Sequence, residues 1–113
     1  MHELSLAESM RELIVDQAKV DGFSSVTQVS IEIGQLSHVQ SDAMEFCFEA
    51  VMVGSPAESA TLNIIGAAGI GKCRSCGETS NIAFRYDPCS HCGAFGLSVI
   101  AGDAVRLVSL EVA

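Results

Sequence analysis

The chain has 113 residues, which is enough for one domain or for a small domain carrying a smaller module. Apolar residues make up 49% of it and the formal charge is −8, so we expect a hydrophobic core and no basic face for nucleic acid. No apolar run approaches the roughly 20 residues of a membrane span, and no signal-peptide pattern opens the chain. We therefore expect a cytoplasmic protein that binds neither membranes nor nucleic acid.

An amphipathic helix is predicted near the start of the chain. Apolar residues recur at helical spacing over residues 5–20, and Ser5 with Glu8 three positions later forms a capping-box pattern. Gly22 is suited to the position that follows a helix, where φ is often positive. The pattern places residues 1–3 just outside the helix, exposed but held against a folded domain.

A strand, a helix and a second strand are predicted next. Residues 26–33 alternate between apolar and polar, which is typical of a half-buried strand, and residues 34–40 read as a loop. A helix begins at Ser41 or Asp42, and a second strand covers residues 60–65. This order is that of a crossover unit, so we expect the two strands to be parallel if they are neighbours.

The second half of the chain predicts an inserted module. Glycine-rich residues 66–71 read as a flexible passage, a cysteine-containing module follows, and the last ten residues, 104–113, read as a strand that returns to the first sheet. The apolar alternation of this last strand slips by one near Val108 and Ser109, which suggests a bulge. We expect an α+β fold, in which two helices pack on a small mixed β-sheet and a zinc-ribbon-like β module is inserted. The predicted domains are 1–66 plus 103–113, and 67–102.

Two Cys-x-x-Cys pairs form the most specific motif of the chain. They are Cys73 with Cys76 and Cys89 with Cys92, and a glycine follows each pair. Four thiolates at the corners of a tetrahedron select zinc, or iron in a rubredoxin-like site. Two disulfides are the alternative, which a chain without a signal peptide disfavours. Four protein ligands leave a zinc ion no open position, so the site is expected to be structural.

The N-terminus is a second candidate metal site. The α-amine of Met1, the amide nitrogen of His2 and the Nδ1 of His2 could close a five-membered and a six-membered ring around one ion. Such a planar set of nitrogens suits Ni(II) or Cu(II). The amide of Glu3 could complete the set, or its carboxylate could orient His2. The alternative is that a short Met-His start is accidental.

Three further residues could take part in metal chemistry. His91 could replace a cysteine on zinc or reach nickel, but four cysteines already complete a tetrahedral set, which favours an exposed knuckle residue. His38 could supply an extra nickel ligand, although a solvated loop histidine is the simpler interpretation. Cys47 lies on the apolar face of the second helix and is interpreted as a core residue.

The chain resembles the HypA/HybF family of hydrogenase nickel-incorporation proteins from end to end. The resemblance rests on the opening Met1–Ala7, the stretch Ile31–Ser37, the stretch Phe46–Glu49, both cysteine pairs and the ending from Ala101. It implies nickel delivery to the large subunit of [NiFe]-hydrogenase with a partner GTPase, HypB, and in some organisms to urease maturation proteins. By position, it implies nickel at Met1, His2 and Glu3. It implies zinc at Cys73, Cys76, Cys89 and Cys92.

The sequence therefore predicts a nickel metallochaperone and not an enzyme. It contains no recognisable nucleophile–base pair and no phosphate-binding loop, so nucleotide hydrolysis is expected only in the partner GTPase. Ni(II) is the transient cargo and Zn(II) the structural ion. Two other classes stay open: a zinc-ribbon interaction module without nickel chemistry, and a redox protein with iron in the cysteine site.

Overall fold

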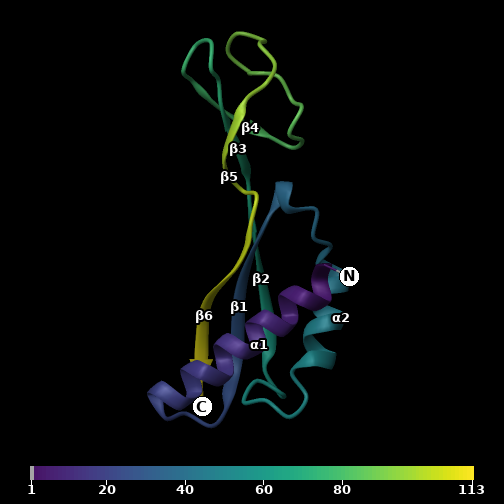
Figure 1. The fold of residues 1–113 in the computed structure, drawn as a ribbon, viewed down its shortest axis with the longest axis vertical. Helices are drawn as coiled ribbons and strands as arrows, with labels where there is room; N and C mark the ends of the chain where they lie inside the picture. Colours follow the sequence, from purple (N-terminus) through teal and green to yellow (C-terminus); the bar gives the residue numbers. More distant parts are fainter. Residues whose placement is uncertain (1) are drawn as a thin grey trace. The chain divides into compact units, whose positions relative to one another are not determined.

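The computed structural model describes residues 2–113. It contains two three-stranded sheets, in the orders β2-β1-β6 and β4-β3-β5 (Figure 1). Within these residues, no helix combines the length and the apolar character needed to cross a bilayer. In chain order the elements are α1 (His2–Asp21), β1 (Val26–Gly34), the 3-10 helix η1 (Gln35–Ser37), α2 (Ser41–Val51), β2 (Thr61–Ala67), β3 (Gly69–Lys72), β4 (Thr79–Ile82), β5 (Ser98–Ala101) and β6 (Val105–Val112).

Two compact units divide these elements between them. The first contains the chain up to Ile31 together with residues 39–65 and 106–113, and the second contains residues 32–38 and 66–105. The predicted α+β class and the inserted β module are confirmed. The sequence-based boundaries, 1–66 plus 103–113 and 67–102, are kept as a proposal about which segments fold independently.

In the first unit, α1 and α2 pack with the central strand β1. The core is formed by side chains from all three elements, and the central strand β1 contributes the buried Val26, Val29 and Ile31. β1 and β2 run in the same direction, as the crossover unit predicts, and β6 runs opposite to β1 (Figure 1). The Oγ1 of Thr27 donates to the carbonyl of Glu111, and the amide of Ala113 donates to Ser25. The predicted return of the last strand to this sheet is therefore confirmed.

The start of α1 differs from the prediction. The helix begins at His2, so Ser5 lies inside it and the predicted capping box at Ser5 and Glu8 is wrong. The Ser5 carbonyl accepts a hydrogen bond from the Oγ of Ser9, as it would in a helix interior. The first turn also makes a tertiary contact, because the carboxylate of Glu3 accepts a hydrogen bond from the backbone amide of Gln40, just before α2.

The glycine-rich stretch 66–71 is not the predicted flexible passage. It forms the end of β2 and most of β3, and both Gly69 and Gly71 are buried. A Cβ on Gly69 would lie 2.5 Å from the carbonyl oxygen of Ile82 and 2.7 Å from the Cγ of Leu36. Glycine is therefore required here because two neighbouring segments approach the backbone closely, and not for flexibility.

Gly69→Ala is expected to destabilise the second unit by about 1–3 kcal/mol, because the added methyl group overlaps backbone atoms that cannot move away. Gly66→Ala is the matched control, since a Cβ there meets nothing within 4 Å. Thermal unfolding of both variants measures the difference. Equal stability of the two variants would contradict the close packing at Gly69.

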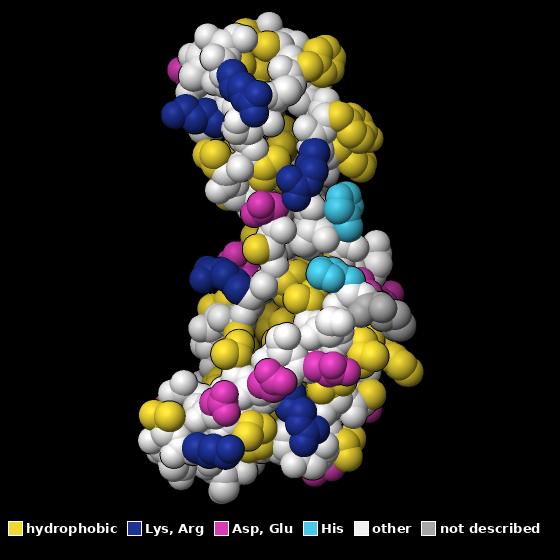
Figure 2. All heavy atoms as spheres, viewed as in Figure 1, with side chains coloured by type: hydrophobic (Ala, Val, Ile, Leu, Met, Phe, Trp, Pro, Cys, Tyr) yellow, Lys and Arg dark blue, Asp and Glu magenta, His cyan; other side chains and the backbone are white. Residues whose placement is uncertain are grey.

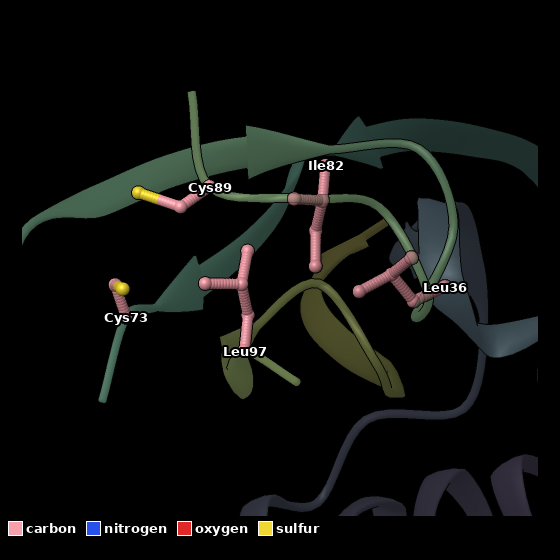
Figure 3. Packing of buried hydrophobic residues seen from close by; sticks show 5 residues of the cluster. All are labelled: Leu36, Cys73, Ile82, Cys89 and Leu97. Atoms are coloured by element: carbon pink, nitrogen blue, oxygen red, sulfur yellow. The ribbon is translucent and has the colours of Figure 1, made fainter. Parts of the chain in front are cut away.

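The second unit has its own hydrophobic core beside the β4-β3-β5 sheet. Leu36 is 1% exposed and packs with Ile82 and Leu97, while Cys73 and Cys89 complete the cluster (Figure 3). Residues 34–40 were predicted as a loop, but η1 lies within them, and the amide of Leu36 donates to the carbonyl of Gly102. The loop prediction missed a core side chain because a lone leucine among polar residues has no periodicity.

Candidate metal sites

The four cysteines of the two Cys-x-x-Cys pairs lie together in the second unit. Their sulfur atoms all lie within 4.8 Å of one another, and they form the one such cluster found across residues 2–113. The Sγ atoms of Cys73 and Cys92 are 3.6 Å apart, and those of Cys76 and Cys89 are 3.7 Å apart. Disulfides would need about 2.05 Å, whereas a tetrahedral ion with bonds of about 2.3 Å holds its sulfurs about 3.8 Å apart. The sulfurs are therefore too far apart for disulfides, and their clustering is compatible with a tetrahedral thiolate site.

Each pair forms a tight turn of the same geometry. The amide of Gly77 donates to the carbonyl of Cys73 at 3.0 Å, and the amide of Gly93 donates to that of Cys89 at 2.9 Å. Both glycines have positive φ, 79° and 78°, which explains the glycine after each pair. The turns bring the two sulfurs of each pair to the same side of the backbone.

Backbone amides inside each turn point at the sulfur of its first cysteine. The amides of Cys92 and His91 lower the pKa of Cys89 to about 6. In the other turn, the amide of Cys76 is the main cause of a lowered pKa for Cys73. Both first cysteines are buried, so these hydrogen bonds stabilise thiolates that water reaches poorly.

The pKa of the second cysteine of each pair is raised instead of lowered. The amide of Glu78 favours the Cys76 thiolate, but burial and the neighbouring thiols outweigh it and raise the pKa to about 12. The amide of Ala94 likewise favours the Cys92 thiolate, and the adjacent Cys73 thiol raises its pKa nonetheless. Four negative sulfurs cannot share this space without a cation, which deprotonates the thiols that it binds.

Metal binding to this cluster is expected to release at least two protons at pH 7, from Cys76 and Cys92, because the pKa of each of these thiols is raised and both are protonated there before the metal binds. Protons and metal compete for the same sulfurs, so the apparent affinity should rise with pH. Calorimetric titration of zinc into metal-free protein, in buffers of different ionisation enthalpy, counts the protons. A release near zero would contradict protonated second cysteines.

Two serines support the thiolates, and the sequence analysis missed both. Ser80 is 4% exposed, and its Oγ lies 3.9 Å from the Sγ of Cys89. The amide and hydroxyl of Ser90 both donate to the Ser80 Oγ, at 3.1 and 3.0 Å. This chain of hydrogen bonds ties β4 to the second cysteine turn. The only signal in the sequence was the position of Ser90 inside that turn, which is not specific.

The two additional histidines lie outside the cysteine cluster. His91 is exposed, and its Nε2 donates to the carbonyl of Thr79 at 3.1 Å. His38 is exposed at the end of η1 with φ 62°, the left-handed conformation. Cys47 is 3% exposed in the core of the first unit, where the sequence placed it.

The N-terminal residues occupy the first turn of α1. Met1, a predicted nickel ligand, lies outside the described residues. His2 is exposed and Glu3 is half-buried. Backbone N–H groups of a first helical turn have no carbonyl partner within the helix, so the His2 amide is not needed for the helix ladder.

The carboxylate of Glu3 is engaged with the backbone. Its own amide and that of Gln40 donate hydrogen bonds to it, and both hold the pKa of Glu3 below its ordinary value. The bond from the Gln40 amide to Oε2 is 3.3 Å long. Glu3 therefore positions the first turn of α1, and it presents an ionised carboxylate one residue from the His2 ring.

Comparison with known proteins gives one consistent result. Residues 1–112 match the family model described as "Hydrogenase/urease nickel incorporation, metallochaperone, hypA". The chain is 46% identical over 112 residues to the hydrogenase maturation factors HypA of Rhodopseudomonas palustris strain BisB5 and of Albidiferax ferrireducens, covering 99% of each chain. The solution structure of the Ni metallochaperone HypA from Helicobacter pylori matches with a TM-score of 0.73 and 25% identity, over 97% of this chain and 96% of that one.

Proposed function

The chain belongs to the HypA family of nickel metallochaperones for hydrogenase maturation, and from that premise we propose that it binds Ni(II) at its N-terminus and delivers the ion to the large subunit of [NiFe]-hydrogenase. The match over residues 1–112 carries this proposal, because it includes both the N-terminal residues and the cysteine pairs. The family acts in metal delivery and maturation, so we propose an accessory protein and not an enzyme.

The proposed nickel ligands come from Met1, His2 and Glu3. Supporting this site, His2 is exposed at the start of α1, and its amide lies where a helix leaves N–H groups free. A square-planar ion promotes loss of the amide proton, and the positive end of the helix dipole favours the negative nitrogen that results. The ionised Glu3 carboxylate beside it partly balances the charge of the ion.

The proposed structural ion is Zn(II), held by Cys73, Cys76, Cys89 and Cys92. The sulfur spacing of 3.6–3.7 Å supports a four-thiolate tetrahedron, which zinc and iron both accept. Absorption spectra distinguish the two, since a ferric thiolate site is coloured and a zinc site is not. Zinc with four protein ligands keeps no position for water, so its role is to hold the second unit together.

The proposed partners follow from hydrogenase maturation. We propose that a GTPase, HypB, supplies any nucleotide hydrolysis and that the hydrogenase large subunit receives the nickel. Urease maturation proteins are further candidates, because the matching family model covers both enzymes. We propose that the protein acts in the cytoplasm, where thiols such as its five cysteines stay reduced.

His2→Ala is expected to abolish nickel binding while zinc content and helical signal stay unchanged, because the exposed His2 ring contributes little to packing. Calorimetric titration of nickel into zinc-loaded protein measures the binding. His38→Ala is the matched control, since it removes another exposed imidazole and should leave the nickel affinity intact. Nickel binding that survives in His2→Ala, or a large loss of helix, would refute the N-terminal site.

A further inference from the structure

The outer face of α2 is exposed and apolar at positions where packing does not explain it. Met44, Cys47 and Phe48 face the core of the first unit, whereas Phe46 on α2 is 74% exposed and Val53, in the turn that follows α2, is 59% exposed. Phe46 belongs to the stretch that carried the family resemblance. Packing accounts for its neighbours Cys47 and Phe48, but it leaves the exposed aromatic ring without a structural role.

A hollow lies along this outer face. It has a volume of about 330 Å³, and three of its lining side chains follow the helical spacing i, i+3 and i+4 on α2, while the fourth comes from the turn that follows the helix. Three apolar groups and one carboxylate thus share this lining. The lining residues are Phe46, Glu49, Ala50 and Val53.

A second hollow, of about 320 Å³, lies on the other side of Glu49. Its rim carries the carboxylates of Glu45, Glu49 and Glu58, and no lysine or arginine lines it. Its lining also includes the apolar side chains of Phe48 from α2 and Leu62 from β2. Glu49 is shared by the two hollows, so together they form one surface, which we call the α2 surface.

The charge of the first unit fits one kind of partner. This unit contains ten Asp or Glu and three Lys or Arg, a net charge of −7, and acidic side chains run along α1 on the face shown in Figure 2. A long-range negative potential attracts a cationic segment, and apolar hollows beside carboxylates accept side chains that are apolar at one end and charged at the other.

We propose that the α2 surface docks a basic amphipathic helix of a partner protein. Apolar side chains of that helix would cover Phe46 and Val53, and its lysines or arginines would meet Glu45, Glu49 and Glu58. Packing of an amphipathic helix along a groove is a common mode of recognition, and an exposed aromatic ring is a frequent anchor for it. The proposal needs neither metal site, so it stands independently of the nickel function.

The test uses a synthetic Leu/Lys amphipathic helix as the probe, with the full zinc-loaded protein. NMR shifts of ¹⁵N-labelled protein locate the binding, and fluorescence anisotropy measures the affinity. We expect saturable binding with shifts confined to α2 and the start of β2. Phe46→Ala should weaken binding about tenfold or more, whereas Val20→Ala, at another exposed apolar side chain (79% exposed), should not.

Charge reversal distinguishes docking at the α2 surface from attraction by the net charge alone. Glu45→Lys with Glu49→Lys should weaken binding about tenfold or more, and Glu8→Lys with Glu12→Lys, the same change on α1, should weaken it less than about threefold. All four carboxylates are exposed, and circular dichroism and zinc content verify the fold. Nickel titration of each variant keeps this result distinct from the proposed function. Equal losses from both pairs, shifts centred on α1, or no saturable binding would each overturn the proposal.

Discussion

Cys76→Ala is expected to release the metal of the cysteine cluster and to disorder the second unit, while the first unit stays folded. The proposed ion would join two turns whose own hydrogen bonds are local, and five buried residues form the hydrophobic cluster beside them. Structural zinc contributes about 10–16 kcal/mol in zinc-finger peptides, far more than so small a core supplies. The first unit keeps its own core, formed by α1, α2 and β1.

Zinc content and two-dimensional NMR measure this outcome, since resonances of the second unit should collapse and those of the first should persist. Cys47→Ala is the matched control, because it removes a buried thiol that belongs to the first unit. That variant should keep one equivalent of zinc. Complete unfolding of Cys76→Ala would show that the domains proposed from the sequence do not fold independently.

Adding Gly-Ser ahead of Met1 is expected to abolish nickel binding although every side chain is retained. The extension converts the α-amine of Met1 into an amide and moves the true terminus away from His2. The five-membered ring of the proposed chelate is then lost. A His2 side chain alone offers one nitrogen, which does not supply the planar set that Ni(II) prefers.

Spectral and calorimetric titrations of nickel compare the native and extended proteins, both zinc-loaded. Gly-Ser added after Ala113 is the control for a longer chain, and it should bind nickel as the native protein does. If the N-terminally extended protein binds equally tightly, the nickel ligands are side chains elsewhere, with His38 and His91 as the first candidates.

The spacing of the cysteines was the part of the site most open to prediction. A Cys-x-x-Cys-Gly turn is a local structure, because its hydrogen bonds join residues at most four apart, as between Gly77 and Cys73. The sequence therefore predicted two turns that could present four thiols, and the structure brings those thiols together. It also determined the class of the fold, since apolar periodicity reports helices and strands wherever one face is buried.

Only the tertiary structure decided where α1 begins and why residues 66–71 are rich in glycine. The helix extends to His2, and the carboxylate of Glu3 in its first turn contacts the amide of Gln40, 37 residues further along the chain, which no local capping rule reveals. From its neighbours in the sequence, Gly69 would be interpreted as flexible. In the structure, the absence of a side chain makes room for Leu36 and Ile82. Local patterns report what a residue can do with its near neighbours in the chain, whereas close packing between distant segments selects which of those possibilities is used.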